Sequence, residues 1–411
     1  MRAEDLTASR RWAVFTAIMV PYIFYAFCWN TENFLRPYMA QALLLSKTQV
    51  AAFYTLQALG ALLGAVVLSQ LADRHGRRNT LAVIAVGIGV TALGIVLVSD
   101  YASALLQRVL MGFFLGGVFG CVVSLYVGLF PPVIRGLLAG LVQLVYNGGD
   151  AMLSWFGRHY DASNWHVVLQ IGGVGALCAA ALVWFIVPND RTLSPWGGGA
   201  PRTARKGASA YVIRELFVAG RWRLTARLAL LCGLNFFAFQ AFNGWVTTYL
   251  RELRGYSPDL VGRVMTALHV GSMVGAIFWG LLADRLGRRA GAAGFALSAV
   301  CIVMYVNVTP SPALYALSGV CYGFCLVCSG VWGPYFAELY PEHLRATAAS
   351  IFNWGRIVSL FGALVAGAVA QRFGLPAIMY VGALTFVAAA ALWWSLPETL
   401  RPREEELLRP A

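Results

Sequence analysis

The chain has 411 residues, of which 59% are hydrophobic and only 12% are charged, and its formal net charge is +13. Soluble globular domains carry about 25% charged residues, so this composition excludes a soluble protein and indicates an integral membrane protein. The surplus of Lys and Arg is then first a signal of membrane topology, and a nucleic-acid partner is not needed to explain it.

Twelve apolar runs are long enough to cross a bilayer, since a transmembrane helix needs about 20 such residues. The predicted spans are 12–35, 48–71, 80–98, 103–129, 136–157, 165–187, 226–250, 258–282, 290–309, 312–338, 346–370 and 375–396. The one long polar stretch, 188–225, contains prolines, a run of glycines and many arginines, and we interpret it as a linker with one short amphipathic helix. The sequence therefore predicts a six-helix bundle over 1–187, a cytoplasmic linker over 188–225, a second six-helix bundle over 226–398 and a cytoplasmic tail over 399–411.

The basic residues give the predicted orientation. The clusters at 74–78, 202–223 and 285–289 fall on one side of the membrane if the spans alternate. By the positive-inside rule, that side is the cytoplasm, together with both chain ends. We expect a multi-pass protein of a bacterial inner membrane.

An internal repeat relates the two halves. The sequence LADRHGRR at 71–78 returns as LADRLGRR at 282–289, a shift of 211 residues. Gly112 matches Gly323 at the same shift, and 130–136 resembles 340–346. The fold class predicted is all-α integral membrane, with twelve transmembrane helices in two pseudo-symmetric six-helix bundles.

Ionisable residues inside predicted spans are functional candidates, because such groups face a cavity or one another. Arg356 lies near the middle of the eleventh span, and its planar fork of donors suits a substrate carboxylate. The alternative is a permanent pair with a buried acid. Asn353 lies three residues earlier on the same helix face, which makes it a second candidate for substrate binding.

A carboxyl or imidazole group at this depth is a candidate proton carrier. Asp150 lies in the fifth span with no local cation, and His269 lies among apolar neighbours in the eighth. His269 could equally be a packing residue. Glu32, with Arg36 four residues later, could be a salt bridge near the interface instead. Further candidate pocket residues are Tyr25 and Asn30 in the first span and Gln240 and Asn243 in the seventh.

The repeated motif resembles the loop signature of the major facilitator superfamily, which follows the second helix of each half. Arg108, followed by Gly112, Gly116 and Gly117, resembles the fourth-helix motif of that superfamily, and 397–399 resembles a common ending after helix twelve. Ser69 departs from the usual glycine, which the second copy keeps as Gly280.

The resemblance implies roles for these motifs. Asp73 is expected to dock against the start of helix eleven, and Asp284 against helix five, closing the cytoplasmic side. Arg77 and Arg288 are expected to serve both topology and gating. For Arg108 the resemblance implies a structural and proton-coupling role, and the sequence leaves open whether it pairs with Asp150 or Glu32.

The segment 333–346, followed by Asn-Trp-Gly-Arg at 353–356, resembles proton symporters of organic acids. An Asp-Gly-x-Asp motif typical of the aromatic-acid branch is missing from 12–35. The resemblance implies import of a small organic acid, either a monocarboxylate or an aromatic carboxylate, by proton symport through alternating access.

Efflux of a drug or metabolite by proton antiport is the alternative. The helix-five Gly-Pro-x-x-Gly-Gly motif usual in antiporters lacks its proline here, where 145–150 reads VYNGGD. No catalytic, phosphate-binding or metal-binding motif is present, so we expect no enzyme activity, no cofactor and no metal. The expected partners are a small organic anion, a proton and the lipid bilayer, with no nucleic acid, and the protein is expected to be a monomer.

Overall fold

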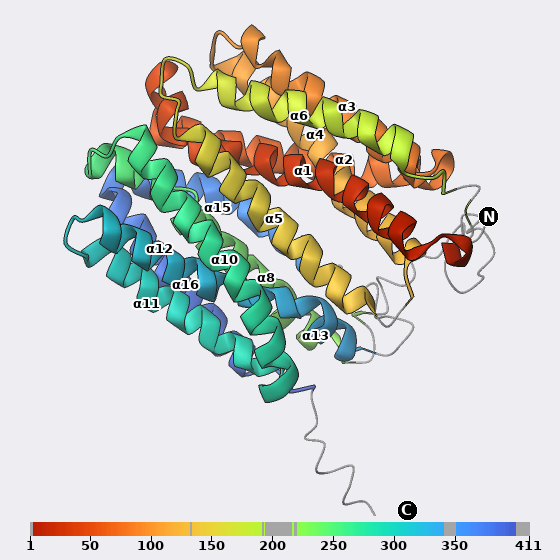
Figure 1. Cartoon of the computed structure of the whole chain (residues 1–411). Helices are drawn as coiled ribbons and strands as arrows, with labels where there is room; N and C mark the ends of the chain where they lie inside the picture. The colour runs from red at the N-terminus through yellow and green to blue at the C-terminus, as the bar shows by residue number, and fades with distance from the viewer. Residues whose placement is uncertain are drawn as a thin grey trace, which may run out of the picture.

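In the computed structural model, the chain is described over residues 3–131, 134–190, 193, 216–217, 220–340 and 351–399. Within these ranges, positions 73, 135, 136, 139, 334, 337, 353, 354, 356 and 359 carry no side-chain description. Most of the predicted linker and the predicted tail therefore lie outside the described residues. All the long elements are helices (Figure 1).

The helices of the first half run close to parallel with one another (Figure 1). They are α1 (Ala8–Ala42), α2 (Lys47–His75), α3 (Arg77–Leu93) with the short 3-10 turn Gly94–Leu97, α4 (Tyr101–Leu129), α5 (Arg135–Gly157) and α6 (His166–Ile186). Within this half, α2 packs along α4, α3 along α6, and α1 against α5 and α6.

The second half repeats this arrangement with more interruptions. It contains α8 (Trp222–Phe242), α9 (Val246–Thr248) and the π-helical turn Tyr249–Leu253, then α10 (Pro258–Leu286), the 3-10 turn Arg288–Ala290, α11 (Gly291–Asn307), α12 (Pro312–Leu326), the 3-10 turn Val327–Val331, α13 (Trp332–Glu338), α15 (Ile351–Phe373) and α16 (Leu375–Trp394). Here α10 packs along α12, α11 along α16, and α8 against α15 and α16.

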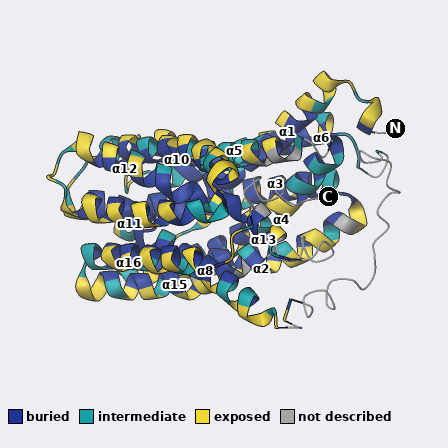
Figure 2. Ribbon diagram, turned by 90° about the horizontal axis from the view of Figure 1, so that it is seen from below, coloured by how far each residue is buried: buried dark blue, intermediate teal, exposed yellow. Residues whose placement is uncertain are grey.

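Ten of the described helical stretches are long and apolar enough to cross a bilayer, and α5 and α15 complete the predicted twelve. Large apolar side chains such as Leu97, Phe185 and Leu384 are exposed on the outer faces of the helices. Figure 2 shows the buried residues between the helices and the exposed ones around them. This pattern is that of a protein whose outer surface meets lipid, and the predicted fold class is confirmed.

The first helix is longer than predicted. It continues to Ala42, through Pro37, where the sequence predicted an end at residue 35. Its polar stretch 30–36 lowers the local hydropathy, yet all of these residues are buried between helices. Glu32 and Arg36 are consequently buried between helices, and they form the salt bridge that the sequence allowed as an alternative.

Glycines bring α2 and α4 into backbone contact, and the repeat reproduces this contact between α10 and α12. A Cβ atom built on Gly112 would lie 2.0 Å from the backbone oxygen of Gln57, and one built on Gly323 would lie 2.1 Å from that of Leu268. Both distances are far below van der Waals contact. These two helix pairs therefore approach as closely as small residues allow.

The two halves meet along two seams, α5 against α10 and α2 against α15. Contacts across the seams gather at the end of the molecule where α1 ends and α2 begins. An ion pair joins Lys47 to Glu252 at 3.4 Å, and the Thr48 hydroxyl donates to Gln371 at 2.7 Å. On the other seam, Arg158 pairs with Asp259 at 3.7 Å. This end of the molecule is closed.

We predict that Gly112→Ala and Gly323→Ala each lower the free energy of unfolding by about 1–3 kcal/mol, because the added methyl group overpacks a backbone contact. Gly140→Ala is the matched control, since no atom lies within 4 Å of a Cβ placed on that residue of α5. The measurement is thermal unfolding in detergent. Equal midpoints for all three variants would contradict the packing described for α2 and α4.

Candidate functional site

Residues 30–36 of α1 form the centre of the polar interior. A helix places residues four apart on one face, so Glu32 meets Arg36 directly. The Glu32 side chain is 0% exposed, and that of Arg36 is 2% exposed. The residues between Glu32 and Arg36 lie on other faces of the helix. Residues 30–36 and the neighbouring turns of α1 therefore contact α2, α4, α5 and α9.

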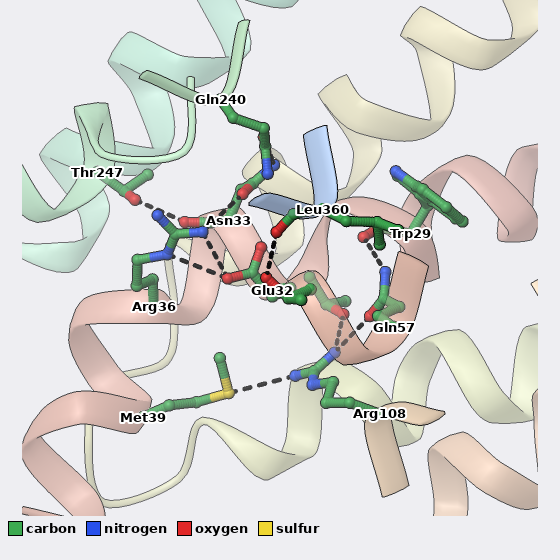
Figure 3. Close-up of polar contacts among 12 residues, drawn as sticks. Trp29, Glu32, Asn33, Arg36, Met39, Gln57, Arg108, Gln240, Thr247 and Leu360 are labelled. Carbon is green, nitrogen blue, oxygen red and sulfur yellow. Dashed lines mark hydrogen bonds and ion pairs between the residues drawn. The ribbon is translucent and has the colours of Figure 1, made fainter. Parts of the chain in front are cut away.

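The Glu32–Arg36 pair is asymmetric (Figure 3). Oε1 of Glu32 accepts hydrogen bonds from both Nε of Arg36, at 3.1 Å, and Nη2, at 2.5 Å. The same Nη2 donates to Oδ1 of Asn33 at 3.1 Å. The guanidinium also lies over the ring of Trp245, with its carbon 4.5 Å from the ring centre. Arg36 thus connects a carboxylate of the first half with an aromatic ring of the second.

Arg108 of α4 is buried nearby but forms hydrogen bonds to neutral groups. Its Nη1 donates to the Thr31 hydroxyl at 3.0 Å and to Oε1 of Gln57 at 3.3 Å, and its Nη2 approaches the sulfur of Met39 at 3.2 Å. No carboxylate of the described residues forms an ion pair with it within 4 Å. The question left open by the sequence is therefore answered for this structure, since Arg108 contacts neither Asp150 nor Glu32 at that distance.

Asn33 joins the two halves. Its side-chain amide donates to Oε1 of Gln240 on α8 at 3.4 Å, and its backbone oxygen accepts from the Thr247 hydroxyl on α9 at 2.8 Å (Figure 3). Between these two residues α8 ends at Phe242, and the chain is not helical again until α9. The interruption in the seventh span therefore lies directly against α1.

A second polar group joins α1, α5 and α10. The side-chain amide of Asn30 donates to Oδ1 of Asp150 at 2.5 Å and to the Tyr146 hydroxyl at 3.1 Å. Nδ1 of His269, on the second half, lies 3.9 Å from Oδ2 of Asp150, which is too far for a hydrogen bond. A proton on His269 together with a small movement would make this a hydrogen-bonded ion pair across the seam.

A cavity of about 20 Å³ lies beside this group. It is lined from both halves by Asn30, Asn33, Phe34, Leu153, Ser154, Phe239, Asn243, Thr247, Met265 and His269. A space of that size holds about one water molecule. Among the described residues, this space between the halves is too small for an organic ligand.

The structure brings together most of the described residues predicted from sequence. Asn30, Asp150 and His269 form one group, and Gln240 joins Asn33 beside the Glu32–Arg36 pair. Asn243 lines the cavity and accepts from the Tyr322 hydroxyl at 2.7 Å. Tyr25 is buried and stacks on Tyr22, with ring centres 5.3 Å apart. The side chains of Arg356 and Asn353 lie outside the description of α15, so their predicted roles stay predictions.

Sequence reasoning did not select Arg36, Gln57 or Asn33 as site residues. Arg36 was assigned only to a salt bridge. Gln57 holds the chain of α2 to that of α1, since its amide donates to the backbone oxygen of Trp29 at 2.9 Å. The available signal was the occurrence of such polar residues inside an otherwise apolar span, which is costly unless they are partnered.

The repeated loop motif has a matching structure in both halves. The Asp190 carboxylate accepts from the backbone N–H groups of Arg77 at 2.9 Å and Arg78 at 3.1 Å. Glu398 accepts likewise from Arg288 and Arg289, both at 2.9 Å. An acidic side chain thus satisfies the free N–H groups that follow the turn in each copy.

The side chains of the motif form a charge cluster in the second half. Arg288 pairs across the turn with Asp284 of α10 at 2.7 Å and with Glu338 of α13 at 2.8 Å. In the first half, Arg77 donates to the backbone oxygen of Ser124 at 3.4 Å. The Asp73 side chain lies outside the description, as do residues 341–350, so the docking predicted for it stays a prediction. Asp284 contacts Arg288 here, and its predicted docking on α5 also stays a prediction.

The sequence profile described as Major Facilitator Superfamily matches residues 18–353 and, in a second placement, 228–410. The chain belongs to this superfamily. Its members are transporters, not enzymes. The buried polar residues between the halves, around Glu32 and Arg36 and around Asp150, are therefore the candidate transport site. The assignment agrees with the twelve helices and with the repeat.

Relatives and solved structures extend the comparison. A gallate transporter of Pseudomonas putida is 25% identical over 94% of this chain and 92% of its own length. A 4-hydroxybenzoate transporter of Acinetobacter baylyi is 26% identical over 87% of this chain and 84% of its own. The crystal structure of a D-xylose–proton symporter superimposes with a TM-score of 0.74 at 16% identity, covering 94% of this chain and 98% of that one. The last comparison shows the shared fold.

We predict that Gln57→Leu lowers the free energy of unfolding by about 1–3 kcal/mol, because it removes an acceptor from buried Arg108 and leaves the Trp29 carbonyl without its donor. Gln57→Glu is the matched comparison, since it keeps an acceptor facing Arg108 and should be less destabilising. Thermal unfolding in detergent checks the order of the two variants. If the leucine variant is as stable as the unmodified protein, the hydrogen bonds around Arg108 contribute little.

Proposed function

We propose that this protein is a secondary active transporter that imports a small organic acid by proton symport through alternating access. The acid would be a monocarboxylate or an aromatic carboxylate. The names of the relatives support this class, because gallate, 4-hydroxybenzoate and cis,cis-muconate, the last from another transport protein of Acinetobacter baylyi, are all carboxylates. The 3-(3-hydroxyphenyl)propionate transporter of Escherichia coli adds a fourth.

The balance of buried charges among the described residues is the observation that supports the proposal. Two buried guanidiniums, Arg36 and Arg108, lie around a single carboxylate, that of Glu32. Asp150, the other buried carboxylate of the described site, is hydrogen-bonded to Asn30 instead. A buried charge without a nearby counter-charge is unfavourable, so the region around Arg36 and Arg108 can accept one further negative charge. An organic anion that enters between the halves would supply that charge.

The proposed substrate contacts come from both halves. They are Arg356, Asn353, Tyr25, Asn30, Gln240 and Asn243. For Arg356 and Asn353 the proposal rests on sequence alone. The other four are buried around the seam. Their mixture of amide donors and an aromatic ring suits an organic acid, whose carboxylate needs polar partners and whose body needs an apolar surface.

The proposed proton-coupling residues are Asp150, Glu32 and His269, with Arg108 as the neighbouring cation. Asp150 has only neutral donors and His269 near its carboxylate among the described groups. A proton on this carboxylate removes a charge from the seam between α5 and α10. Protonation would thereby change how strongly the two halves hold together, which is what a coupled transporter requires.

The proposed cycle uses the two ends of the molecule alternately. The end at Lys47, Arg158 and Glu252 is closed in this structure. If the basic loop motifs lie in the cytoplasm, as the positive-inside rule predicts, the closed end faces the outside. Asp73, Arg77, Asp284 and Arg288 would close the opposite end in the other conformation. The proposed setting is a bacterial inner membrane, with both termini and the linker 188–225 in the cytoplasm and the protein acting as a monomer.

Uptake into proteoliposomes tests this proposal directly. With an imposed pH gradient, acid outside, we expect accumulation of labelled gallate or 4-hydroxybenzoate, and none of D-xylose. Protein-free liposomes control for passive entry of the neutral acids. Antiport would instead drive the acids toward the acidic side. Absence of carboxylate transport in either direction, over a panel that adds lactate, pyruvate, nicotinate and sugar acids, would refute the proposal.

We predict that Asp150→Asn reduces proton-driven accumulation at least about tenfold while counterflow exchange between two pools of labelled acid continues. The reason is that a neutral amide keeps the hydrogen bond to Asn30 but cannot take up and release a proton. Asp161→Asn, in the loop after α5, is the matched control. Full accumulation in the Asp150 variant would remove Asp150 from the coupling mechanism.

A further inference from the structure

We infer that Arg36 is a carboxylate-binding residue of the transport site, and that Glu32 occupies it until a proton arrives. The substrate carboxylate and the Glu32 carboxylate would then compete for one guanidinium. This inference rests on the proposed function and makes it more specific. It names Arg36 as the residue that the substrate anion can bind only after a proton has bound Glu32.

The Glu32–Arg36 pair leaves one carboxylate oxygen of Glu32 without a hydrogen bond among the described groups. Both hydrogen bonds that Arg36 donates to Glu32 go to Oε1, and Oε2 has no hydrogen-bond partner among the described groups although it is buried. In the strongest arginine–carboxylate pairs, two parallel bonds reach two oxygens. The pair therefore falls short of the geometry that an incoming carboxylate could adopt.

A buried amide donor, a glycine and an aromatic ring surround the guanidinium of Arg36. Nε2 of Gln240 is a buried donor without a partner among the described residues, on the side chain whose oxygen accepts from Asn33. A Cβ atom built on Gly244 would lie 3.0 Å from Nη1 of Arg36, so any larger residue there would push the guanidinium away. The Trp245 ring also lies against the guanidinium, with its centre 4.5 Å from the guanidinium carbon. Donors and a flat support are thus already arranged around one position.

Arg36 lies in the seam between the two halves. Trp245 and Gly244 belong to the second half, and Arg36 to the first, so separation of the halves at this end would uncover the guanidinium. A surface cavity of about 310 Å³, lined by Pro37, Ala40, Gln41, Leu45, Arg251 and Glu252, lies along the last turns of α1 next to it. A solute that arrives at this end would meet Arg251 and then Arg36.

The charges balance in the exchange. The groups that act on Glu32 from the elements packed around it are Arg36, on its own helix, and Arg108, from α4. The side chains that α2 and α8 bring to this network, Gln57 and Gln240, are neutral. When a proton binds Glu32, the two guanidiniums lose their only carboxylate among these groups, and the carboxylate of the substrate takes its place on Arg36. On release, the substrate leaves with its charge, Glu32 loses its proton, and the original pair forms again.

A purely structural pair is the competing explanation. Buried ion pairs are often no more stable than apolar packing of the same volume, and an unpartnered buried oxygen is unfavourable. A pair that serves only stability would be expected to use both oxygens of Glu32. The asymmetric geometry is instead what a pair that must open in every cycle requires.

Binding of labelled gallate and 4-hydroxybenzoate to the full-length protein in detergent tests the inference, at acidic and at alkaline pH. In the unmodified protein, affinity should rise as the pH falls, because the proton frees Arg36. Glu32→Gln should bind with the acidic-pH affinity at both pH values. Arg36→Lys should bind at least about tenfold more weakly, since a point charge cannot replace the planar fork. Arg227→Lys, which lies away from the pair on α8 and contacts Ser395, is the matched control and should behave like the unmodified protein.

Thermal unfolding separates loss of binding from loss of structure, and the double variant with Glu32→Gln and Arg36→Gln should fold without binding. A second measurement needs no variant. If one proton accompanies each carboxylate, uptake of 4-hydroxybenzoate driven by a pH gradient should not change when a potassium diffusion potential is imposed. A strong dependence on that potential would overturn the one-to-one exchange.

The two possible failures are distinguishable. If the unmodified protein binds and transports these acids, but Glu32→Gln keeps the original pH dependence and Arg36→Lys keeps the original affinity, the pair is structural and this inference is wrong. If the unmodified protein binds and transports no carboxylate at all, the proposed function itself fails.

Discussion

Charges buried between helices in a bilayer have only one another and nearby dipoles to stabilise them, because lipid supplies no water. In this protein that constraint falls on a few residues of α1. Glu32 and Arg36 neutralise each other along one helix face, whereas Arg108 depends on the neutral oxygens of Thr31 and Gln57. Hydrogen bonds that partner these side chains and their neighbours join α1 to α2 and α4, and Asn33 joins it to α8.

The repeat explains why the polar groups lie where they do. Within each half, glycines at matching positions bring helices together backbone to backbone, as Gly112 and Gly323 do, and such contacts leave no room for adjustment. Between the halves, exposed polar contacts such as Lys47–Glu252, which form and break at little net cost, lie beside apolar packing of Tyr54 and Ala58 against Leu360. Two bundles with stiff interiors are suited to rocking against each other around a site in the seam.

Much of the fold was predictable from the sequence, because length and hydropathy identify spans, and the two copies of the loop motif identify the repeat. Local pairs were predictable for the same reason, as with Glu32 and Arg36 at helical spacing. The meeting of Asn30, Asp150 and His269 was not, because it depends on how α1, α5 and α10 cross in space. The length of α1 was missed because residues 30–36 are polar, and hydropathy alone does not tell a polar helix end from a polar stretch that is satisfied inside the protein.

The two copies of the repeat differ most where they face each other. At the shift of 211 residues, Glu32 corresponds to Asn243, Asn33 to Gly244 and Arg36 to Thr247. The first copy keeps a continuous helix through this region and carries the charges, whereas the second interrupts its helix after Phe242. A glycine in that interruption leaves space beside the guanidinium, and Trp245 covers it. The centre of the molecule is therefore built from unlike halves of a symmetric frame, with the Glu32–Arg36 pair on the first half and Gly244 and Trp245 against it on the second.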